Sequence, residues 1–374
     1  MRRVLYIPFC LLMLCGMASC SKKKQSVDYN NLINIDVPLK QSSTTELPRI
    51  SVLFDTVEIR LESTGFESLV GEVGEIKICG DTMVIRQSDN TFILFDMNGR
   101  FIRKINRKGR GHGEYITIQG FDIDEANRQI VVNGGNGDML RYTLDGVFVS
   151  QAETGFSFFD FALMPNGDFL FFTPFSHMEP NGLWQTDADF NFKRQLVKLE
   201  DYEVNVYTGG RALVHVNDSV IGFMGVENDN VFYHIYSDTI IPVYHVTSQA
   251  FEESEQTKTG ENHNVPTAYK SHYFESDGLM MFTHHFSEND SYHSVRTFYD
   301  NKSGQVTYLY NVNYKKVDWE DCMIPFFTNN YKNNFFYVLN YGEIENDKRL
   351  SARYPDMNEE SNPIIVIYRT KCPQ

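Results

Sequence analysis

The sequence lacks the features that mark several large classes of protein. It carries no stripe of basic residues: 34 Lys and Arg stand against 49 Asp and Glu, for a formal net charge of −15. Nucleic acid is therefore not an expected partner, because a phosphate backbone is bound through clustered cations. The apolar run Val4–Leu14 is too short for a membrane-spanning helix, which needs about 20 such residues.

Cysteine is scarce and forms no recognisable motif. Of the six cysteines, three lie within the first 20 residues, and Cys79, Cys322 and Cys372 are far apart without a Cys-x-x-Cys pair. An odd number of distant cysteines does not predict a disulfide framework. A disulfide between Cys322 and Cys372 is one alternative, and three buried free thiols are the interpretation we favour.

The signatures of common catalytic sites are also missing. The sequence contains no Gly-x-Ser-x-Gly elbow, no Gly-Lys-Ser/Thr after a glycine loop and no His-Glu-x-x-His. With 49 acidic residues, chance pairs of carboxylates are plentiful, so a glycosidase pair cannot be argued. These absences favour a protein that binds without catalysis and without a cofactor.

The N-terminus predicts export and a lipid anchor. Arg2 and Arg3 precede the apolar run, and small residues lead into Cys20. This order resembles a bacterial lipoprotein signal, in which residues 1–19 are removed and the thiol of Cys20 is diacylated. Met17 stands where such signals usually carry leucine. The alternative is an ordinary secretory signal with a chance cysteine.

The residues after Cys20 bear on the location of the protein. Ser21 is not an aspartate, so the resemblance to lipoproteins implies sorting to the outer membrane. Surface-displayed lipoproteins of the Bacteroidetes carry acidic residues next, whereas Lys22–Lys24 are basic, so we expect the periplasmic face. Residues 20–47 are polar with no sustained period and predict a flexible tether. Residues 48–374 remain for the folded domain.

One short pattern recurs through the folded domain: two polar or turn-forming residues, then three largely apolar ones. Its first apolar positions are 83, 130, 169, 220, 279 and 335, so it returns every 39 to 59 residues. Helix-period stretches are nearly absent, and short β-rich runs lie between Gly, Asn and Asp. Repeats of this length in an all-β chain are typical of propeller blades. The sequence therefore predicts a six-bladed β-propeller, with two tandem β-sandwiches as the alternative.

The two ends of the domain are expected to close the ring. A β-rich run, Ile50–Leu61, precedes the first repeat, and Ile364–Tyr368 forms the last predicted strand. We expect these two segments to pair, because ring closure removes the exposed edges that an open sheet would leave.

The second half of the first two repeats supports a family resemblance. Phe95–Phe101 and Tyr142–Phe148 align without a gap and place Asn-Gly or Asp-Gly between apolar runs, a strong hairpin signal. Together with the Gly-rich run Lys108–Tyr115, they resemble the six-bladed β-propeller lipoproteins of the Bacteroidetes, relatives of the NHL-repeat propellers. His112 stands where those proteins usually have proline. The resemblance implies the fold and an envelope location, but not a function.

The Gly-rich run is the first candidate site. Its glycines permit close backbone approach, and Arg107 and Arg110 offer planar donors for carboxylates or sugar hydroxyls. With His112 and Glu114 they could form a ligand-binding mouth. The alternative is structural: Glu114 pairs with an arginine between blades, and Tyr115 lies in the core.

Two further groups are candidates for binding. Trp184 and Tyr207 lie beside turn-rich segments and could stack on a sugar. Histidines gather in the fifth repeat, where His272 with His284 or His285 could hold a metal ion beside an acidic neighbour. Adjacent residues of a strand point to opposite faces, so His284 and His285 are not expected to chelate one ion. Surface or loop histidines without a metal are the alternative.

The leading hypothesis is an envelope lipoprotein whose propeller binds a glycan, a peptide or a protein partner without catalysis. The alternative is a polysaccharide or peptide lyase or hydrolase that uses an axial pocket of the propeller. A structural subunit with a broad apolar patch is a third hypothesis.

Overall fold

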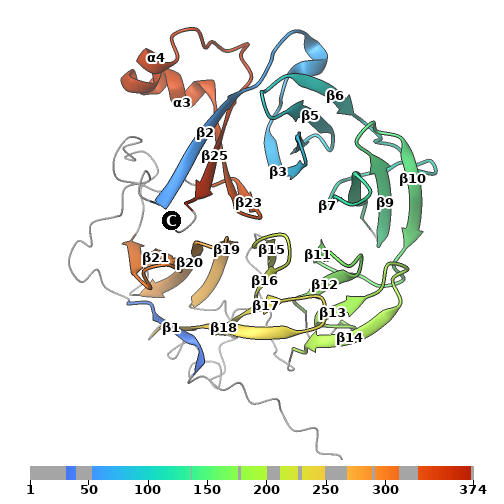
Figure 1. Ribbon diagram of the computed structural model, residues 1–374, viewed down its shortest axis with the longest axis vertical. Helices are drawn as coiled ribbons and strands as arrows, with labels where there is room; N and C mark the ends of the chain where they lie inside the picture. Colours follow the sequence, from blue (N-terminus) through green and yellow to red (C-terminus); the bar gives the residue numbers. More distant parts are fainter. Residues whose placement is uncertain are drawn as a thin grey trace, which may run out of the picture. The chain divides into compact units, whose positions relative to one another are not determined.

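Short strands bounded by turn residues fold into six sheets, arranged as blades around a common axis (Figure 1). Each sheet has four antiparallel strands, and one sheet has a fifth, parallel strand. In the computed structural model, the described residues are 31–38, 53–135, 137–175, 178–199, 211–225, 230–248, 268–288, 291–310 and 327–371. The predicted lipidation site Cys20, the candidate Tyr207, and Cys322 and Cys372 lie outside these ranges. Within the described residues, no helix has the length and hydropathy needed to cross a bilayer.

Each blade begins with the strand nearest the axis. Blade one comprises β3 (Val73–Cys79), β4 (Thr82–Gln87), β5 (Phe92–Asp96) and β6 (Phe101–Ile105), and a 3-10 helix, η2 (Phe66–Ser68), precedes it. Blade two comprises β7 (Gly120–Asp124), β8 (Gln129–Asn133), β9 (Asp138–Thr143) and β10 (Phe148–Glu153). Blade three comprises β11 (Asp160–Leu163), β12 (Phe169–Thr173), β13 (Gly182–Thr186) and β14 (Phe192–Val197).

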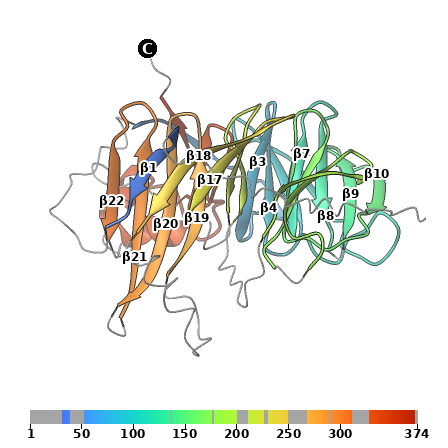
Figure 2. The same cartoon turned by 90° about the horizontal axis from the view of Figure 1, so that it is seen from below.

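The second half of the ring continues this order. Blade four comprises β15 (Leu213–His215), β16 (Ile221–Met224), β17 (Val231–Ile235) and β18 (Ile240–Thr247). Blade five comprises β19 (Ala268–Glu275), β20 (Leu279–Glu288), β21 (Ser291–Asp300) and β22 (Val306–Tyr310). Blade six comprises β23 (Asn329–Tyr331), β24 (Asn334–Leu339), β25 (Ile364–Thr370) and β2 (Phe54–Arg60). Figure 2 shows the hairpin β20–β21 of blade five extending beyond its neighbours.

The predicted six-bladed propeller is confirmed, and the recurring pattern marks the same place in every blade. Its six apolar runs coincide with the second strands, from β4 in blade one to β24 in blade six. These strands are buried almost throughout, and in β12 all five residues are buried. They are buried because both faces of a second strand pack against neighbouring blades, so hydrophobic side chains are needed at successive positions.

The predicted closure is also confirmed. Strand β2, from the N-terminal part of the domain, pairs antiparallel with β25, with Phe54 opposite Thr370 and Arg60 opposite Ile364. The last blade therefore takes its outermost strand from the opposite end of the chain. This pairing places β2 beside the helical segment of blade six, where the candidate site lies.

The prediction that residues 20–47 form a flexible tether is wrong for a short segment. Strand β1 (Ile33–Asp36) lies within residues 20–47 and adds a fifth, parallel strand to β18 of blade four. Ile35 and Val37 are buried there among residues of blades four and five. Apolar Ile33, Ile35 and Val37 alternate with polar Asn34 and Asp36, a period-two signal too short to stand out in a polar segment.

Candidate functional site

Blade six carries an insertion that no other blade has among the described residues. The connection from β24 to β25 contains two short helices, α3 (Tyr341–Asn346) and α4 (Lys348–Arg353). Asp347 begins α4, because its carboxylate accepts hydrogen bonds from the N–H groups of Arg349 at 2.8 Å and Leu350 at 3.3 Å. Ile344 and Leu350 are buried against the sheet and hold both helices in place.

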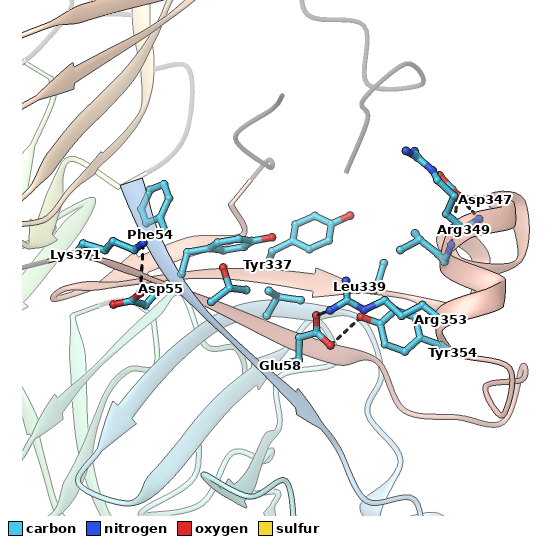
Figure 3. Close-up of a pocket in the computed structure, with 14 residues that line it drawn as sticks. Phe54, Asp55, Glu58, Tyr337, Leu339, Asp347, Arg349, Arg353, Tyr354 and Lys371 are labelled. Carbon is cyan, nitrogen blue, oxygen red and sulfur yellow. Dashed lines mark hydrogen bonds and ion pairs between the residues drawn. The ribbon is translucent and has the colours of Figure 1, made fainter. Parts of the chain in front are cut away.

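A cavity of about 690 Å³ lies between this insertion and the strands of blade six (Figure 3). Its size falls in the range of roughly 300–1,000 Å³ that small-molecule sites occupy. We call it the blade-six pocket. It is lined by Phe54, Asp55, Thr56, Glu58, Tyr337, Leu339, Asp347, Arg349, Leu350, Arg353, Tyr354, Val366, Tyr368 and Lys371.

Charged side chains are paired at the edge of the pocket. Glu58 of β2 accepts a hydrogen bond from the Tyr354 hydroxyl at 2.9 Å and contacts the Arg353 guanidinium (Figure 3). Asp347 lies 3.4 Å from Arg349, and Asp55 lies 3.8 Å from Lys371. Strand β2 therefore supplies two carboxylates, and the segment from Asp347 to Lys371 supplies three cations and a third carboxylate, to one concave surface.

Three tyrosines form much of the floor of the blade-six pocket. Tyr337, Tyr354 and Tyr368 are all buried, and burial raises the pKa of each phenol, that of Tyr354 to about 12. Nearby carboxylates raise the pKa further, Glu343 for Tyr337 and Glu58 for the other two. The hydroxyls of Tyr337 and Tyr354 donate hydrogen bonds to Glu343 and Glu58, respectively.

Sequence reasoning missed this pocket. Its residues come from Phe54–Glu58 at one end of the domain and Tyr337–Lys371 at the other, and no motif connects them. One signal was present in the sequence. The segment that connects the second strand to the third, from Leu339 to Ile364, has many more residues than the same connection in blades one and two. A long connection within a blade is a common place for function.

A second cluster of charged side chains lies along the axis of the propeller, and we call it the axial network. Asp122 of blade two is completely buried and lies 2.8 Å from Lys77 of blade one and 2.8 Å from His215 of blade four. It also accepts a hydrogen bond from the N–H of Leu163 in blade three at 2.7 Å. Burial alone would raise the pKa of Asp122, but His215 and Lys77 outweigh it and hold the pKa well below the usual range.

A neighbouring set completes the axial network. Arg211 contacts both Glu75 and Asp160 at 2.9 Å, and Asp160 accepts hydrogen bonds from two backbone N–H groups of blade four. Burial raises the pKa of Asp160 even beside Arg211. Because these side chains satisfy one another, the axial network joins blades rather than presenting charges to a ligand.

The Gly-rich run packs against the outer part of blade two. Arg107 donates from Nε and Nη2 to the carbonyl of Gly146 at 3.1 and 2.7 Å, and the His112 ring meets the edge of Phe148. Glu114 accepts a hydrogen bond from the N–H of Gly111 at 2.8 Å, and Arg110 is exposed.

The structural alternative for this run holds in part. Tyr115 is buried as that alternative expected, whereas Glu114 bonds within its own loop rather than to an arginine of another blade. A ligand role for the four polar residues stays a prediction.

Trp184 does not offer a surface for a sugar. Its side chain is 0% exposed, stacked on Phe171 with ring centroids 6.1 Å apart and met at its edge by Phe156. The expectation of a Trp184 platform is therefore not supported. The tryptophan lies in strand β13, a third strand, where a large side chain fills the space between blades.

Two of the three candidate histidines of blade five lie close together, and the third does not join them. His284 is buried, whereas His272 and His285 approach the Ser271 hydroxyl, with Nδ1 and Nε2 at 2.6 and 2.7 Å from Oγ. Burial lowers the pKa of His284 to about 3 and that of His285 to about 4. Across the described residues, no group of three or more His, Cys, Asp or Glu side chains is placed to hold a metal ion.

Comparison with known proteins identifies the fold and the family. The chain is similar to a predicted exported protein from Bacteroides fragilis NCTC 9343, with 18% identity, a TM-score of 0.67, and 91% of this chain and 100% of that chain covered. It is also similar to a member of the DUF4221 family from Bacteroides vulgatus ATCC 8482, with 11% identity, a TM-score of 0.46, and 88% and 100% covered. None of the curated proteins compared with the chain matches it. The family model described as Domain of unknown function (DUF4934) matches residues 32–369, and the chain therefore belongs to this family.

Proposed function

We propose that the protein is an exported, lipid-anchored propeller that binds a small polar ligand in the blade-six pocket and does not transform it. The blade-six pocket carries this proposal: it is concave, of ligand size, and lined by paired charges over buried tyrosines. The surrounding blades supply a rigid frame, as binding sites require. Glycans and peptides are the ligand classes that fit such a surface.

The anchor and location rest on the N-terminal sequence. Cys20 is the proposed lipidated residue, and the resemblance to Bacteroidetes lipoproteins supports the outer membrane, with the periplasmic face favoured by Lys22–Lys24. The test is metabolic labelling with a fatty acid in a bacterial host. Label on the wild type and none on Cys20→Ala, which should also leave the membrane fraction, would support the anchor. Unlabelled wild-type protein would refute it.

The enzyme alternative placed its chemistry in an axial pocket. Along the axis, Asp122, Lys77 and His215 are instead joined to one another by contacts of 2.8 Å. The third hypothesis, a structural subunit with a broad apolar patch, has no observation that favours it over the pocket. Binding at blade six is therefore the function we carry forward.

Thermal unfolding of the mature protein in detergent tests the pocket. A ligand at about 100 times its Kd adds roughly 2.7 kcal/mol to the stability of the folded state, which raises the unfolding midpoint. The panel contains neutral and acidic oligosaccharides and peptides. Thr56→Phe should abolish the shift by filling the pocket, whereas Ser150→Phe, on the exposed outer strand of blade two, should not. A panel without any shift, or a shift that survives Thr56→Phe, would refute the proposal.

A further inference from the structure

Three cations line the blade-six pocket beside three carboxylates, and all three cations are about half exposed. Arg349 and Arg353 are one turn apart on α4, so both reach the same side of that helix, and both line the cavity (Figure 3). Their side chains are 45% and 52% exposed, and that of Lys371 is 42% exposed. Each guanidinium has five N–H donors, more than one carboxylate contact can use.

Two of the three carboxylates at the pocket are largely covered and already engaged, whereas Asp55 is 72% exposed. Glu58 accepts from the Tyr354 hydroxyl at 2.9 Å and contacts Arg353. Asp347 accepts from the N–H groups of Arg349 and Leu350, and thereby begins α4. A ligand that brought only donors would find one exposed carboxylate, Asp55, whereas a ligand that brings acceptors would meet three half-exposed cations.

The tyrosines do not offer ring faces for stacking. Tyr337, Tyr354 and Tyr368 are 7%, 4% and 5% exposed, so little more than their edges reaches the cavity. The Tyr354 ring is occupied in addition by Arg60 and Arg353, whose guanidinium carbons lie 5.3 and 5.5 Å from its centroid. Neutral sugars, which are commonly held by an aromatic face, would find no such platform here.

We infer that the blade-six pocket takes a carboxylate-bearing ligand, held by the arginines of α4; the inference rests on the proposed function. A planar carboxylate matches the donor geometry of a guanidinium, because its two oxygens can accept two parallel N–H bonds at once. Uronic-acid oligosaccharides and acidic peptides share this chemistry. The remaining pocket surface, formed by Leu339, Leu350 and Val366, receives the carbon skeleton.

The test uses matched probes on the mature protein by titration calorimetry. Trigalacturonic acid is compared with galactotriose, and triglutamate with triglutamine, so that each pair differs in its acidic groups. The inference expects at least a tenfold preference for one acidic probe over its neutral partner. Which acidic probe binds then distinguishes a glycan from a peptide source.

Two arginine variants locate the binding. Arg353→Gln should weaken the acidic probe at least tenfold, because it removes a charged donor that lines the pocket. Arg60→Gln is the matched control, since Arg60 stacks on the same Tyr354 ring and is 49% exposed but binds Asp356 outside the pocket lining. Arg60→Gln should leave the affinity unchanged, and unfolding midpoints will confirm that both variants fold.

The outcomes of these experiments distinguish the carboxylate inference from the proposed pocket function. Equal binding of acidic and neutral probes, abolished by Thr56→Phe, would overturn the carboxylate inference while the pocket function stands. Acidic binding that Arg353→Gln leaves intact would overturn the inference by placing the site elsewhere. If no probe of either kind binds, both the inference and the pocket function are refuted.

Discussion

The carboxylate of Asp122 in blade two lies 2.8 Å from Nε2 of His215 in blade four, so two blades that are not neighbours in the ring are joined across the axis. Blade three lies between them in sequence and contributes a backbone N–H to the same carboxylate. One side chain therefore fixes the relative position of three blades, and the buried Lys77 adds a fourth.

Removing this carboxylate should be costly. Asp122→Asn removes the closest carboxylate from the buried Lys77 and leaves only Glu75, at 3.6 Å, and breaking a buried ion pair costs about 3–5 kcal/mol. We expect a loss of that size in the free energy of unfolding, measured by urea denaturation. Asp81→Asn is the control, because the Asp81 side chain is 84% exposed and its pair with Arg128 at 3.6 Å should contribute less than about 1 kcal/mol. Equal losses in the two variants would contradict the role of the axial network.

The same carboxylate should make stability depend on pH. The folded-state pKa of Asp122 is lowered below the ordinary value near 4, so its contribution is present above about pH 4 and is lost as the pH falls below that value. The free energy of unfolding of the wild type should therefore fall more steeply between about pH 4 and pH 3 than that of Asp122→Asn. Urea denaturation at several pH values measures both slopes, and parallel curves would count against the assignment.

The strand β1 should stabilise blade four. Ile35 is buried between blades four and five, and truncating such a side chain costs about 2–5 kcal/mol. We expect Ile35→Ala to lower the free energy of unfolding by that amount. Asn34→Ala, at the exposed neighbouring position, should change it by less than about 0.5 kcal/mol. If Ile35→Ala were as mild as Asn34→Ala, β1 would contribute nothing to the fold in solution.

Two glycines in equivalent turns isolate the contact between blades six and one. Gly99 and Gly304 both have positive φ, +81° and +68°, in the turn between the third and fourth strands of their blades. A Cβ on Gly99 would lie 2.0 Å from the carbonyl oxygen of Arg60, whereas one on Gly304 would meet nothing closer than 3.8 Å.

Gly304→Ala should therefore cost about 1–2 kcal/mol, from backbone strain alone. Gly99→Ala should cost about 1–3 kcal/mol more, because β2 must move. Thermal and urea unfolding of the two variants give the difference. Equal costs would mean that the turn of blade one does not press on β2.

Much of the fold could be predicted because propeller blades repeat a local pattern. Each second strand needs successive buried residues after a turn, and such runs, as at Met83 or Leu279, are visible in the sequence. The pairing of β2 with β25 followed from the need to close a ring. β1 escaped prediction because only three apolar positions, Ile33, Ile35 and Val37, carry its signal.

The candidate site could not be predicted in the same way. Asp122 and His215 are 93 residues apart, and Glu58 and Tyr354 are 296 apart, so nothing local connects them. The residues that stood out in the sequence have structural contacts. The Gly-rich run packs on blade two, and Trp184 fills the space between blades. Pairing of distant charges depends on the complete ring, which local patterns do not encode.

The pairing of β2 with β25 has a consequence for biogenesis. Strand β2 is synthesised long before its partner Ile364–Thr370, because almost the whole propeller lies between them in the sequence. Until then β2 presents an unpaired edge, which is prone to join other chains, and contacts of such high sequence separation form slowly. A chain cut short before residue 364 cannot close at all. The ring therefore closes, and the edge of β2 is covered, only once the segment Ile364–Thr370 has been made.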